Sequence, residues 1–506
     1  MFKILSAKEA ISLIKDGDTI AINSFIAWSN PEALHDALYE RIVETKTPKG
    51  LNIFCAAGFG AWDENRLGDR YMRLGAVKEV IAGHYGGMPG AVKAALAGEI
   101  EAYNLPLGVL SQTVRAAAAG KDWMLSEIGI GIFCDPRVDT YALNDISKRE
   151  LVKVVEVEGK EYLLYYTPKP DIAFIKGTTV DPNGNISFEK EYLIVDALAV
   201  AQATKRNGGT VIVEVERVSH EFSRPRNVIV PGILVDVVVV CDNSYEHNSY
   251  NPALSGDVHV PATQMDYYIN KLSGDNNFKK PTGSKNRDIV ADIIGNRAAK
   301  ELRPGHTVNL GIGIPENVGV HASKQGLLKD IYITVEAGGI GGLPAPGLAF
   351  GATIGADMIS EMSTQFDFYE GGGLDICFLG GLEVDMYGNV NSHKMDGYYA
   401  GIGGFANITH ATKNIVFCLT FTTKGLEITS KDGKVAINRE GSIRKFKREV
   451  SAVSFSGKHA ILRGQRVIYV TERCVFELTE NGLKLIEVYD GIDEKSQIRD
   501  MLDFEV

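Results

Sequence analysis

The stretch Asp171-Ile-Ala-Phe-Ile-Lys-Gly-Thr-Thr-Val-Asp-Pro-Asn-Gly-Asn185 recurs later in the chain as Asp375-Ile-Cys-Phe-Leu-Gly-Gly-Leu-Glu-Val-Asp-Met-Tyr-Gly-Asn389. The two copies share eight identical residues in fixed register. An apolar strand followed by a Gly-Asn turn is common in proteins. A match of this length in register instead indicates that a structural unit has been duplicated.

Further matches follow in the same order along the two halves of the chain. Ala203-Thr-Lys205 recurs as Ala411-Thr-Lys413, and the pair Gly17-Asp-Thr19 and Asn30-Pro-Glu32 recurs as Gly305-His-Thr307 and Ile314-Pro-Glu316. Apolar strands alternate with amphipathic helices in each half, which is typical of α/β domains. We therefore predict an α/β fold of two tandem homologous α/β/α domains, at 1–275 and 288–506, with a polar linker at 276–287.

Local signals place the first elements of each copy. Ser6 and Glu9 have capping-box spacing before a helix that ends at Gly17, and Asn30 is expected to be the N-cap of a second helix. We expect strands at 19–22 and 307–310, and a helix from Pro315. Short strands beyond about Lys424, such as Arg466–Thr471 and Cys474–Leu478, predict a small antiparallel β annex near the C-terminus.

The strongest candidate for chemistry is Glu336. It follows the apolar run Ile331-Tyr-Ile-Thr-Val335 and precedes Ala337-Gly-Gly-Ile-Gly-Gly342. The run predicts a buried strand, and ligands in open α/β sheets bind at the carboxyl ends of strands. A carboxylate there, flanked by small residues, can act as a nucleophile. With an ordinary pKa near 4.3 it would be ionised at neutral pH and would need no base.

The duplication provides an internal comparison for Glu336. Laying Gly86-Gly87 on Gly341-Gly342 places Ile81 opposite Glu336, so only the second half carries the carboxylate. If Glu336 were only a solvent-exposed residue at the end of a strand, the first half could carry a polar residue at the equivalent position as well. The asymmetry favours one specialised site in the second domain.

Composition excludes several classes of partner and site. The chain has 506 residues and a net charge of -11, which argues against nucleic acid or an anionic membrane as a partner. The six cysteines and ten histidines show no metal-ligand spacing, so no metal site is expected. Charged residues interrupt the N-terminal segment too early for a signal peptide, and no apolar run is long enough to cross a bilayer, so a cytoplasmic protein is expected.

Two glycine loops are candidates for binding phosphate or stabilising an oxyanion. Gly311-Ile-Gly313 lies between a strand and a helix, but Glu316 replaces the third glycine of the dinucleotide fingerprint. A nicotinamide dehydrogenase is therefore only a weak alternative, and a structural turn or an anion-binding loop remain equally open. The second loop, Gly401-Ile-Gly-Gly-Phe405, could direct backbone amides at a developing oxyanion.

Together, four motifs resemble those of the family I coenzyme A transferases, and most closely the single-chain propionate/acetate CoA-transferase branch. The motifs are Val308-Asn-Leu-Gly-Ile-Gly-Ile-Pro315, Val335-Glu-Ala-Gly-Gly-Ile-Gly-Gly342, Phe366-Asp-Phe-Tyr-Glu-Gly-Gly-Gly-Leu-Asp375 and Gly401-Ile-Gly-Gly-Phe405. The similarity extends nearly end to end, through Tyr469-Val-Thr-Glu-Arg-Cys-Val-Phe476.

The resemblance implies a ping-pong transfer of coenzyme A from an acyl-CoA to a free carboxylic acid through a glutamyl-CoA thioester on Glu336. It implies oxyanion stabilisation by the amides of Gly404 and then Gly403, and coenzyme A binding near Gly311, Gly313, Gly338, Gly401, Gly403 and Gly404. Coenzyme A would be a substrate, with no permanently bound cofactor. A homo-oligomer acting on short-chain or apolar-tailed acids is expected.

Two departures from relatives concern the acceptor acid. Leu107 stands where relatives commonly have a glutamine that resembles a substrate-side hydrogen-bond donor, and Asn23-Ser24 replaces a Gly-Gly pair. Nothing in the sequence shows that the nearby Gln112 substitutes for that glutamine. Two other functions stay open: an acyl-CoA hydrolase on the same scaffold, and a non-catalytic ligand-sensing module.

Overall fold

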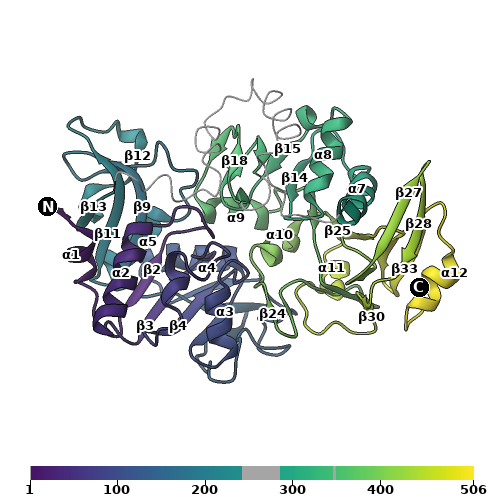
Figure 1. The fold of residues 1–506 in the computed structure, drawn as a ribbon, viewed down its shortest axis with the longest axis horizontal. Helices are drawn as coiled ribbons and strands as arrows, with labels where there is room; N and C mark the ends of the chain where they lie inside the picture. Colours follow the sequence, from purple (N-terminus) through teal and green to yellow (C-terminus); the bar gives the residue numbers. More distant parts are fainter. Residues whose placement is uncertain (1, 242–284, 346–348) are drawn as a thin grey trace.

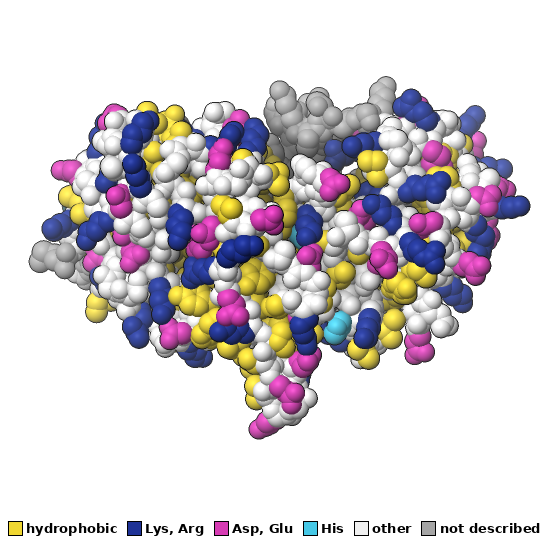
Figure 2. Space-filling view, turned by 90° about the horizontal axis from the view of Figure 1, so that it is seen from below, with side chains coloured by type: hydrophobic (Ala, Val, Ile, Leu, Met, Phe, Trp, Pro, Cys, Tyr) yellow, Lys and Arg dark blue, Asp and Glu magenta, His cyan; other side chains and the backbone are white. Residues whose placement is uncertain are grey.

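The computed structural model describes residues 2–241, 285–345 and 349–506. The chain forms two α/β units side by side, each built on one large sheet (Figure 1). Within the described residues, no helix is long and apolar enough to cross a membrane. On the face shown in Figure 2, basic and acidic side chains are interspersed, without a broad field of either charge.

The first sheet has eight strands joined in parallel along its main path. Their order is β1 (Lys3–Leu5), β13 (Val237–Val240), β11 (Thr210–Val218), β9 (Ile172–Val180), β2 (Thr19–Ile22), β3 (Leu51–Cys55), β4 (Val77–Ala82) and β5 (Glu101–Asn104). One face packs against α1 (Ala7–Ile11), α2 (Glu32–Thr45) and α3 (Pro89–Leu96), and the other against α4 (Leu107–Ala118) and α5 (Ala197–Arg206). Both faces are therefore buried, as parallel sheets require.

The second sheet has a parallel centre and antiparallel margins. Its order is β19 (Met358–Ile359), β16 (Gly339–Ile340), β15 (Tyr332–Thr334), β14 (Thr307–Leu310), β20 (Ile376–Leu379), β25 (Asn414–Cys418), β31 (Arg466–Val470), β32 (Cys474–Thr479) and β33 (Gly482–Val488). Helices α7 (Lys285–Ala299) and α8 (Glu316–Lys324) cover one face, and α9 (Met362–Glu370) and α10 (Phe405–Ala411) cover the other.

The two domains share one hydrophobic core. A single cluster of buried side chains contains α4 and α5 of the first domain together with α9 and α10 of the second. Burial of apolar surface on this scale is the main force holding such elements together. The inner faces of the two sheets therefore meet across these four helices, and residues at the join are held rigidly by both halves.

The predicted duplication is confirmed in detail. The carboxylate of Asp171 accepts a hydrogen bond from the Thr19 amide at 2.9 Å, and Asp375 accepts one from the Thr307 amide at 3.0 Å. The same correspondence corrects the alignment of Ile81 with Glu336. Thr19 pairs with Asn52 of β3 as Thr307 pairs with Tyr332 of β15, so counting along each strand places Ala56 opposite Glu336. The first half still lacks a carboxylate at that position.

The predicted start of the first helix is confirmed, whereas the N-cap predicted for the second helix is wrong. The capping box of Ser6 and Glu9 is formed at the start of α1. Asn30 is not the N-cap of α2, because Pro31 occupies that position and the Asn30 amide donates to the Ile26 carbonyl at 2.6 Å. Strands 19–22 and 307–310 form as predicted, and α8 begins at Glu316, just after Pro315.

The structure differs from the prediction in the linker and in the C-terminal annex. The boundary at 275 and residues 276–284 of the linker lie outside the described residues, whereas residues 285–287 belong to α7. An antiparallel annex exists in β27 (Glu427–Lys431) with β28 (Lys434–Arg439), and β32 and β33 are antiparallel to their neighbours. The 466–470 stretch, expected in the annex, instead extends the main sheet as β31, parallel to β25.

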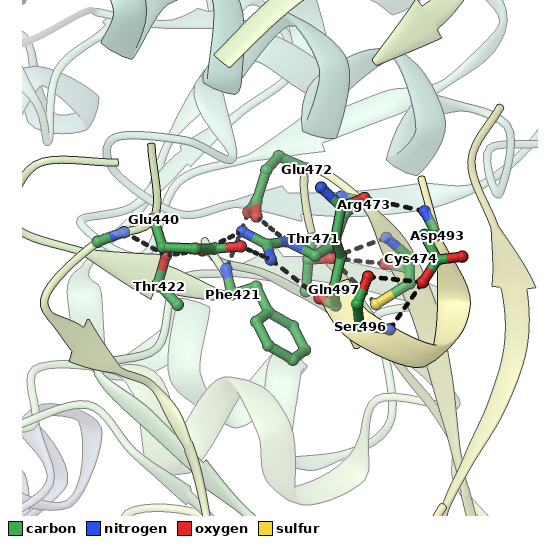
Figure 3. Close-up of polar contacts among 11 residues, drawn as sticks. Phe421, Thr422, Glu440, Thr471, Glu472, Arg473, Cys474, Asp493, Ser496 and Gln497 are labelled. Carbon is green, nitrogen blue, oxygen red and sulfur yellow. Dashed lines mark hydrogen bonds and ion pairs between the residues drawn. The ribbon is translucent and has the colours of Figure 1, made fainter. Parts of the chain in front are cut away.

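A buried arginine stabilises the C-terminal part of this domain (Figure 3). Arg473 is fully buried, and its guanidinium donates to both carboxylate oxygens of Glu440, at 2.6 and 2.9 Å, and to Glu472 at 2.7 Å. It also donates to the Gln497 carbonyl at 3.0 Å and lies over the Phe421 ring. The pair with Glu472 is costly to break, because the fully buried Glu472 carboxylate would be left without a counter-charge.

We expect Arg473→Met to lower the free energy of unfolding by about 3–5 kcal/mol, since it strands the Glu472 carboxylate. Lys93→Met, which breaks the exposed pair with Glu64, should change it by less than about 1 kcal/mol. Urea denaturation followed by circular dichroism measures both variants. Equal small losses would show that the buried pair contributes no more than a surface one.

Candidate active site between the domains

Glu336 lies in a tight turn at the carboxyl edge of the second sheet. The turn connects β15 to β16 and is closed by hydrogen bonds from the Val335 amide to the Gly339 carbonyl at 2.8 Å and from the Gly338 amide to the Val335 carbonyl at 3.0 Å. Gly338 is needed there because its φ is +118° and a Cβ atom would lie 2.2 Å from the Ser360 carbonyl oxygen. Its amide completes the turn, so Gly338 shapes the site and does not present that amide to a ligand.

The carboxylate of Glu336 is packed against the loop Gly401–Gly404, which precedes α10. A Cβ atom on Gly404 would lie 1.8 Å from Oε2 of Glu336, so only glycine fits beside this carboxylate. The Gly404 amide hydrogen-bonds to the Glu336 carboxylate. The structure therefore brings Glu336 and Gly404 together as the sequence predicted.

The same loop is held by the first domain. The amides of Tyr85 and Gly86 donate to the Ala400 carbonyl, each at 2.8 Å, and the Ile402 amide donates to the Asn104 side chain at 2.9 Å. A Cβ atom on Gly401 would lie 2.9 Å from the Gly83 carbonyl oxygen. Gly401 is therefore required for close approach of the two domains, and the site lies at their junction.

Gly403 does not have the free amide that was expected of a second oxyanion donor. Its N–H donates to the Gly83 carbonyl at 2.8 Å, and its own carbonyl accepts from the Leu107 amide at 2.9 Å. Both groups thus bind the first domain. In this arrangement the amide of Gly404, and not that of Gly403, faces the Glu336 carboxylate.

Gly311 and Gly313 follow β14, the strand next to β15, and so lie on the same edge as Glu336. The Gly311 amide donates to the Phe378 carbonyl at 2.8 Å, and the Gly313 amide donates to the Glu316 carboxylate at 3.1 Å. These amides are satisfied within the protein. The loop can contribute shape and its exposed Ile312 side chain to a binding surface, but its glycine amides do not form an open anion cradle.

Burial changes the acidity of Glu336. Desolvation raises its pKa to about 7, against the opposing effect of the Gly404 hydrogen bond. The expectation of an ordinary pKa, with full ionisation at neutral pH, is therefore wrong, because burial moves the titration of Glu336 into the neutral range. An enclosed carboxylate that is poorly solvated is also more reactive than an exposed one.

Tyr369, Thr334 and Asn309 form a hydrogen-bonded group near Glu336 that was not predicted from the sequence. The Tyr369 hydroxyl donates to Thr334 Oγ1 at 2.9 Å, and the Asn309 amide reaches the Tyr369 hydroxyl at 3.4 Å. Tyr369 comes from α9, within the Phe366–Asp375 motif that was noted only for its resemblance. Its position in an aromatic-rich, glycine-terminated segment was the available signal.

The two departures from relatives also have structural accounts. Leu107 is buried at the start of α4, and Gln112 donates to Asp367 and Glu370, each at 3.0 Å, so Gln112 is not free to replace the missing donor. Asn23 is buried and fixed by hydrogen bonds with Ile194 and Asp196, while Ser24 donates to the Gly58 carbonyl at 3.0 Å. Among the described residues, no group of three His, Cys, Asp or Glu side chains could hold a metal ion.

Comparisons with known proteins agree with this architecture. The family model for coenzyme A transferase matches residues 4–241 and 291–492. The chain is 40% identical to the acetate CoA-transferase YdiF of Escherichia coli (strain K12), over 99% of this chain and 92% of the relative. It is 36% identical to the caffeate CoA-transferase of Acetobacterium woodii, over 100% of this chain and 94% of the relative.

A solved structure has the same fold. The acyl-CoA transferase YdiF of E. coli O157:H7, as a thioester complex with CoA, superposes with a TM-score of 0.87 at 39% identity, covering 100% of this chain and 93% of that one. The chain therefore belongs to the coenzyme A transferase family. It is an enzyme of the single-chain, family I type, a CoA-transferase with both domains in one polypeptide.

Proposed function

We propose that this enzyme transfers coenzyme A between an acyl-CoA and a free carboxylic acid by a ping-pong mechanism with Glu336 as the nucleophile. The observation that carries the proposal is the carboxylate of Glu336, enclosed between the domains and packed against the Gly404 amide. A nucleophile beside a preorganised amide is the arrangement that acyl transfer requires. A family relative solved as a thioester complex with CoA supports it.

In the first step a Glu336 oxygen attacks the thioester carbonyl, the C–S bond breaks, and a glutamyl anhydride and CoA thiolate form. The thiolate sulfur then attacks the glutamyl carbonyl, the anhydride C–O bond breaks, and the first acid leaves as its carboxylate. A second acid reverses both steps. The Gly404 amide is placed to stabilise negative charge on the Glu336 carbonyl oxygen.

The substrates we propose are short-chain or apolar-tailed carboxylic acids. The names of two relatives, acetate and caffeate CoA-transferase, span a small and an aromatic acid. Leu107, buried beside the Gly403 carbonyl, replaces a polar group with an apolar one in this region. We also propose domain limits of 1–275 and 288–506, a cytoplasmic location and a homo-oligomeric assembly.

Intact-protein mass spectrometry tests the covalent mechanism. Mixing the enzyme with acetyl-CoA in the absence of an acceptor acid should add the mass of one CoA, less water, to each chain, and propionate should remove it. A peptide map should place the adduct on Glu336. A chain that never gains this mass while transferring CoA would contradict the proposal.

A hydrolase and a ligand sensor are the competing functions. The hydrolase alternative predicts release of free CoA at a rate independent of added carboxylic acid, whereas the transferase releases new acyl-CoA in proportion to the acid. The sensor alternative predicts acyl-CoA binding without turnover. Liquid chromatography of the CoA species with and without propionate separates all three.

The rate of adduct formation should depend on pH near neutrality. Because the nucleophile is the ionised form and its pKa is raised to about 7, the rate should rise about tenfold from pH 6 to pH 8 and level off above pH 8. Rapid-quench mass spectrometry between pH 5.5 and 9 measures it. A rate already constant at pH 6 would show that Glu336 ionises like an exposed glutamate.

A further inference from the structure

One buried amide in α9, that of Gln365, lies near the Tyr369 hydroxyl but makes no well-formed hydrogen bond among the described residues. Gln365 in α9 is 1% exposed, yet neither its Nε2 nor its Oε1 makes a hydrogen bond of good geometry with the described residues. Buried polar groups are nearly always satisfied, because leaving one unpaired is costly. A buried amide that is incompletely satisfied, close to the proposed nucleophile, therefore indicates a further partner that is present only during the reaction.

The topology places Gln365 beside Glu336. Helix α9 precedes β20 and runs back along the sheet, from its carboxyl edge toward its amino edge. Tyr369 of α9 lies over Thr334 of β15, to which it donates a hydrogen bond. Going toward the carboxyl edge, Gln365 lies four residues, about 6 Å, before Tyr369 on α9, and Glu336 follows Thr334 by two residues, in the turn at this edge of the sheet.

The neighbours of Gln365 support this placement. Phe366 follows it, and a Cβ atom on Gly404 would lie 3.1 Å from the Phe366 ring and 1.8 Å from Oε2 of Glu336, so both groups contact the same glycine. Burial raises the pKa of the Tyr369 phenol. The Gln365 amide lies close enough to the Tyr369 hydroxyl to oppose that rise in part, and the charge of Glu336 adds to it.

The proposed reaction also calls for a second hydrogen-bond donor to the carbonyl oxygen of Glu336. Attack on a carbonyl moves a pair of electrons onto its oxygen, and enzymes commonly stabilise that charge with two hydrogen-bond donors. The Gly404 amide supplies one at Glu336. The amides of Gly403, Gly311 and Gly313 are occupied by other protein groups, as described above.

We propose that the Gln365 carboxamide is the second donor: its Nε2–H binds the carbonyl oxygen of Glu336 when the CoA thiolate attacks. In that step the sulfur forms a bond to the glutamyl carbon and the carbonyl electrons move onto the oxygen held by Gln365 and Gly404. They return as the anhydride C–O bond breaks and the acid leaves as a carboxylate. No proton is transferred. This inference depends on the proposed Glu336 mechanism.

Gln365→Met tests it, because methionine has a similar length and no donor. We expect adduct formation and kcat to fall about 100-fold, as for loss of an oxyanion donor, while the KM for acetyl-CoA stays within threefold of wild type. Removal of an unsatisfied amide should leave the melting temperature equal or higher. A Gln365→Met enzyme with wild-type kcat would overturn the inference, as would a loss of kcat accompanied by a lower melting temperature.

Thr353→Val is the matched control. Thr353 is fully buried, its hydroxyl also has no hydrogen-bond partner among the described residues, and it packs on Gly339 in β16. This variant should retain wild-type kcat. If it loses activity to the same extent as Gln365→Met, general disturbance of the turn explains both and the inference fails. The wild-type adduct, measured separately, decides whether the Glu336 mechanism itself stands.

Discussion

Glu336→Gln should abolish transfer, with kcat reduced by at least about 10⁴-fold, and no CoA adduct should appear on the chain. The amide of glutamine is nearly isosteric with the carboxylate, so the side chain still fits against Gly404. It cannot form the anhydride, however, and removal of a nucleophile costs rates of this order. Acetyl-CoA and propionate turnover, together with intact-protein mass, measures the effect.

The same variant should not be destabilised. Because burial raises the pKa of Glu336 to about 7, the folded state favours the protonated form, and ionisation lowers the stability of the wild type as pH rises from about 4.5 through 7. Glutamine is neutral throughout. At pH 8 the variant should therefore melt at the same or a higher temperature than wild type, and near pH 4 the difference should vanish.

Loss of activity with retained stability separates chemistry from folding. As a control, Glu361→Gln changes a partly buried carboxylate in the same domain, at the start of α9, whose pKa burial raises and the charge of Arg115 opposes. It should keep at least half of the wild-type kcat. Substantial transfer by Glu336→Gln, with an adduct elsewhere on the chain, would assign the nucleophile to another residue.

The sequence was sufficient to predict the duplicated α/β architecture, because strand and helix signals repeat in order and the paired aspartates make identical hydrogen bonds. It was insufficient to align the two halves around Glu336, and the predicted equivalence of Ile81 and Glu336 is wrong. The two Gly-Gly motifs used for that alignment occur in loops, where spacing is not tied to sheet register. The strand pairing fixes the register instead and identifies Ala56 as the counterpart of Glu336.

Glu336 itself could be predicted because its signal is local: an apolar strand, a carboxylate and glycines in succession. Its acidity could not, since the raised pKa comes from enclosure by residues distant in sequence. The role of Gly403 depends likewise on Gly83 in the other domain, which takes its amide. Gln365 carried no signal, because a glutamine in an amphipathic helix is ordinarily a surface residue and only the packed structure shows it buried.

The arrangement of the two domains supports the proposed role of Glu336. The first domain supplies Gly83, Tyr85, Gly86 and Asn104 as hydrogen-bond partners that fix the Gly401–Gly404 loop. The second supplies Glu336. The proposed nucleophile and its amide donor are thus placed by different sets of contacts, and the helices between the sheets form one core that supports both. Preorganised donors of this kind stabilise charge without reorganising during the reaction.

Gly404→Ala should reduce kcat by about 100- to 1,000-fold while the fold is retained. The added Cβ atom would lie 1.8 Å from Oε2 and 3.0 Å from Cδ of Glu336, so the carboxylate must move by more than about 1 Å. Gly404 has φ −81° and ψ −1°, which alanine adopts without strain. The cost is therefore displacement of the nucleophile from its amide donor and its substrate, and not a distorted backbone.

Two comparisons make this prediction specific. Gly319→Ala, in the middle of α8, should have wild-type kcat, and its free energy of unfolding should stay within about 1 kcal/mol of wild type, because the helix propensity of alanine offsets the 3.2 Å approach of its Cβ atom to the Leu310 side chain. Combining Gly404→Ala with Glu336→Asp shortens the carboxylate by one methylene group and relieves the contact. Alanine at 404 should then reduce kcat by less than about fivefold relative to Glu336→Asp alone. An equal loss in both backgrounds would show that Gly404 acts independently of the Glu336 carboxylate.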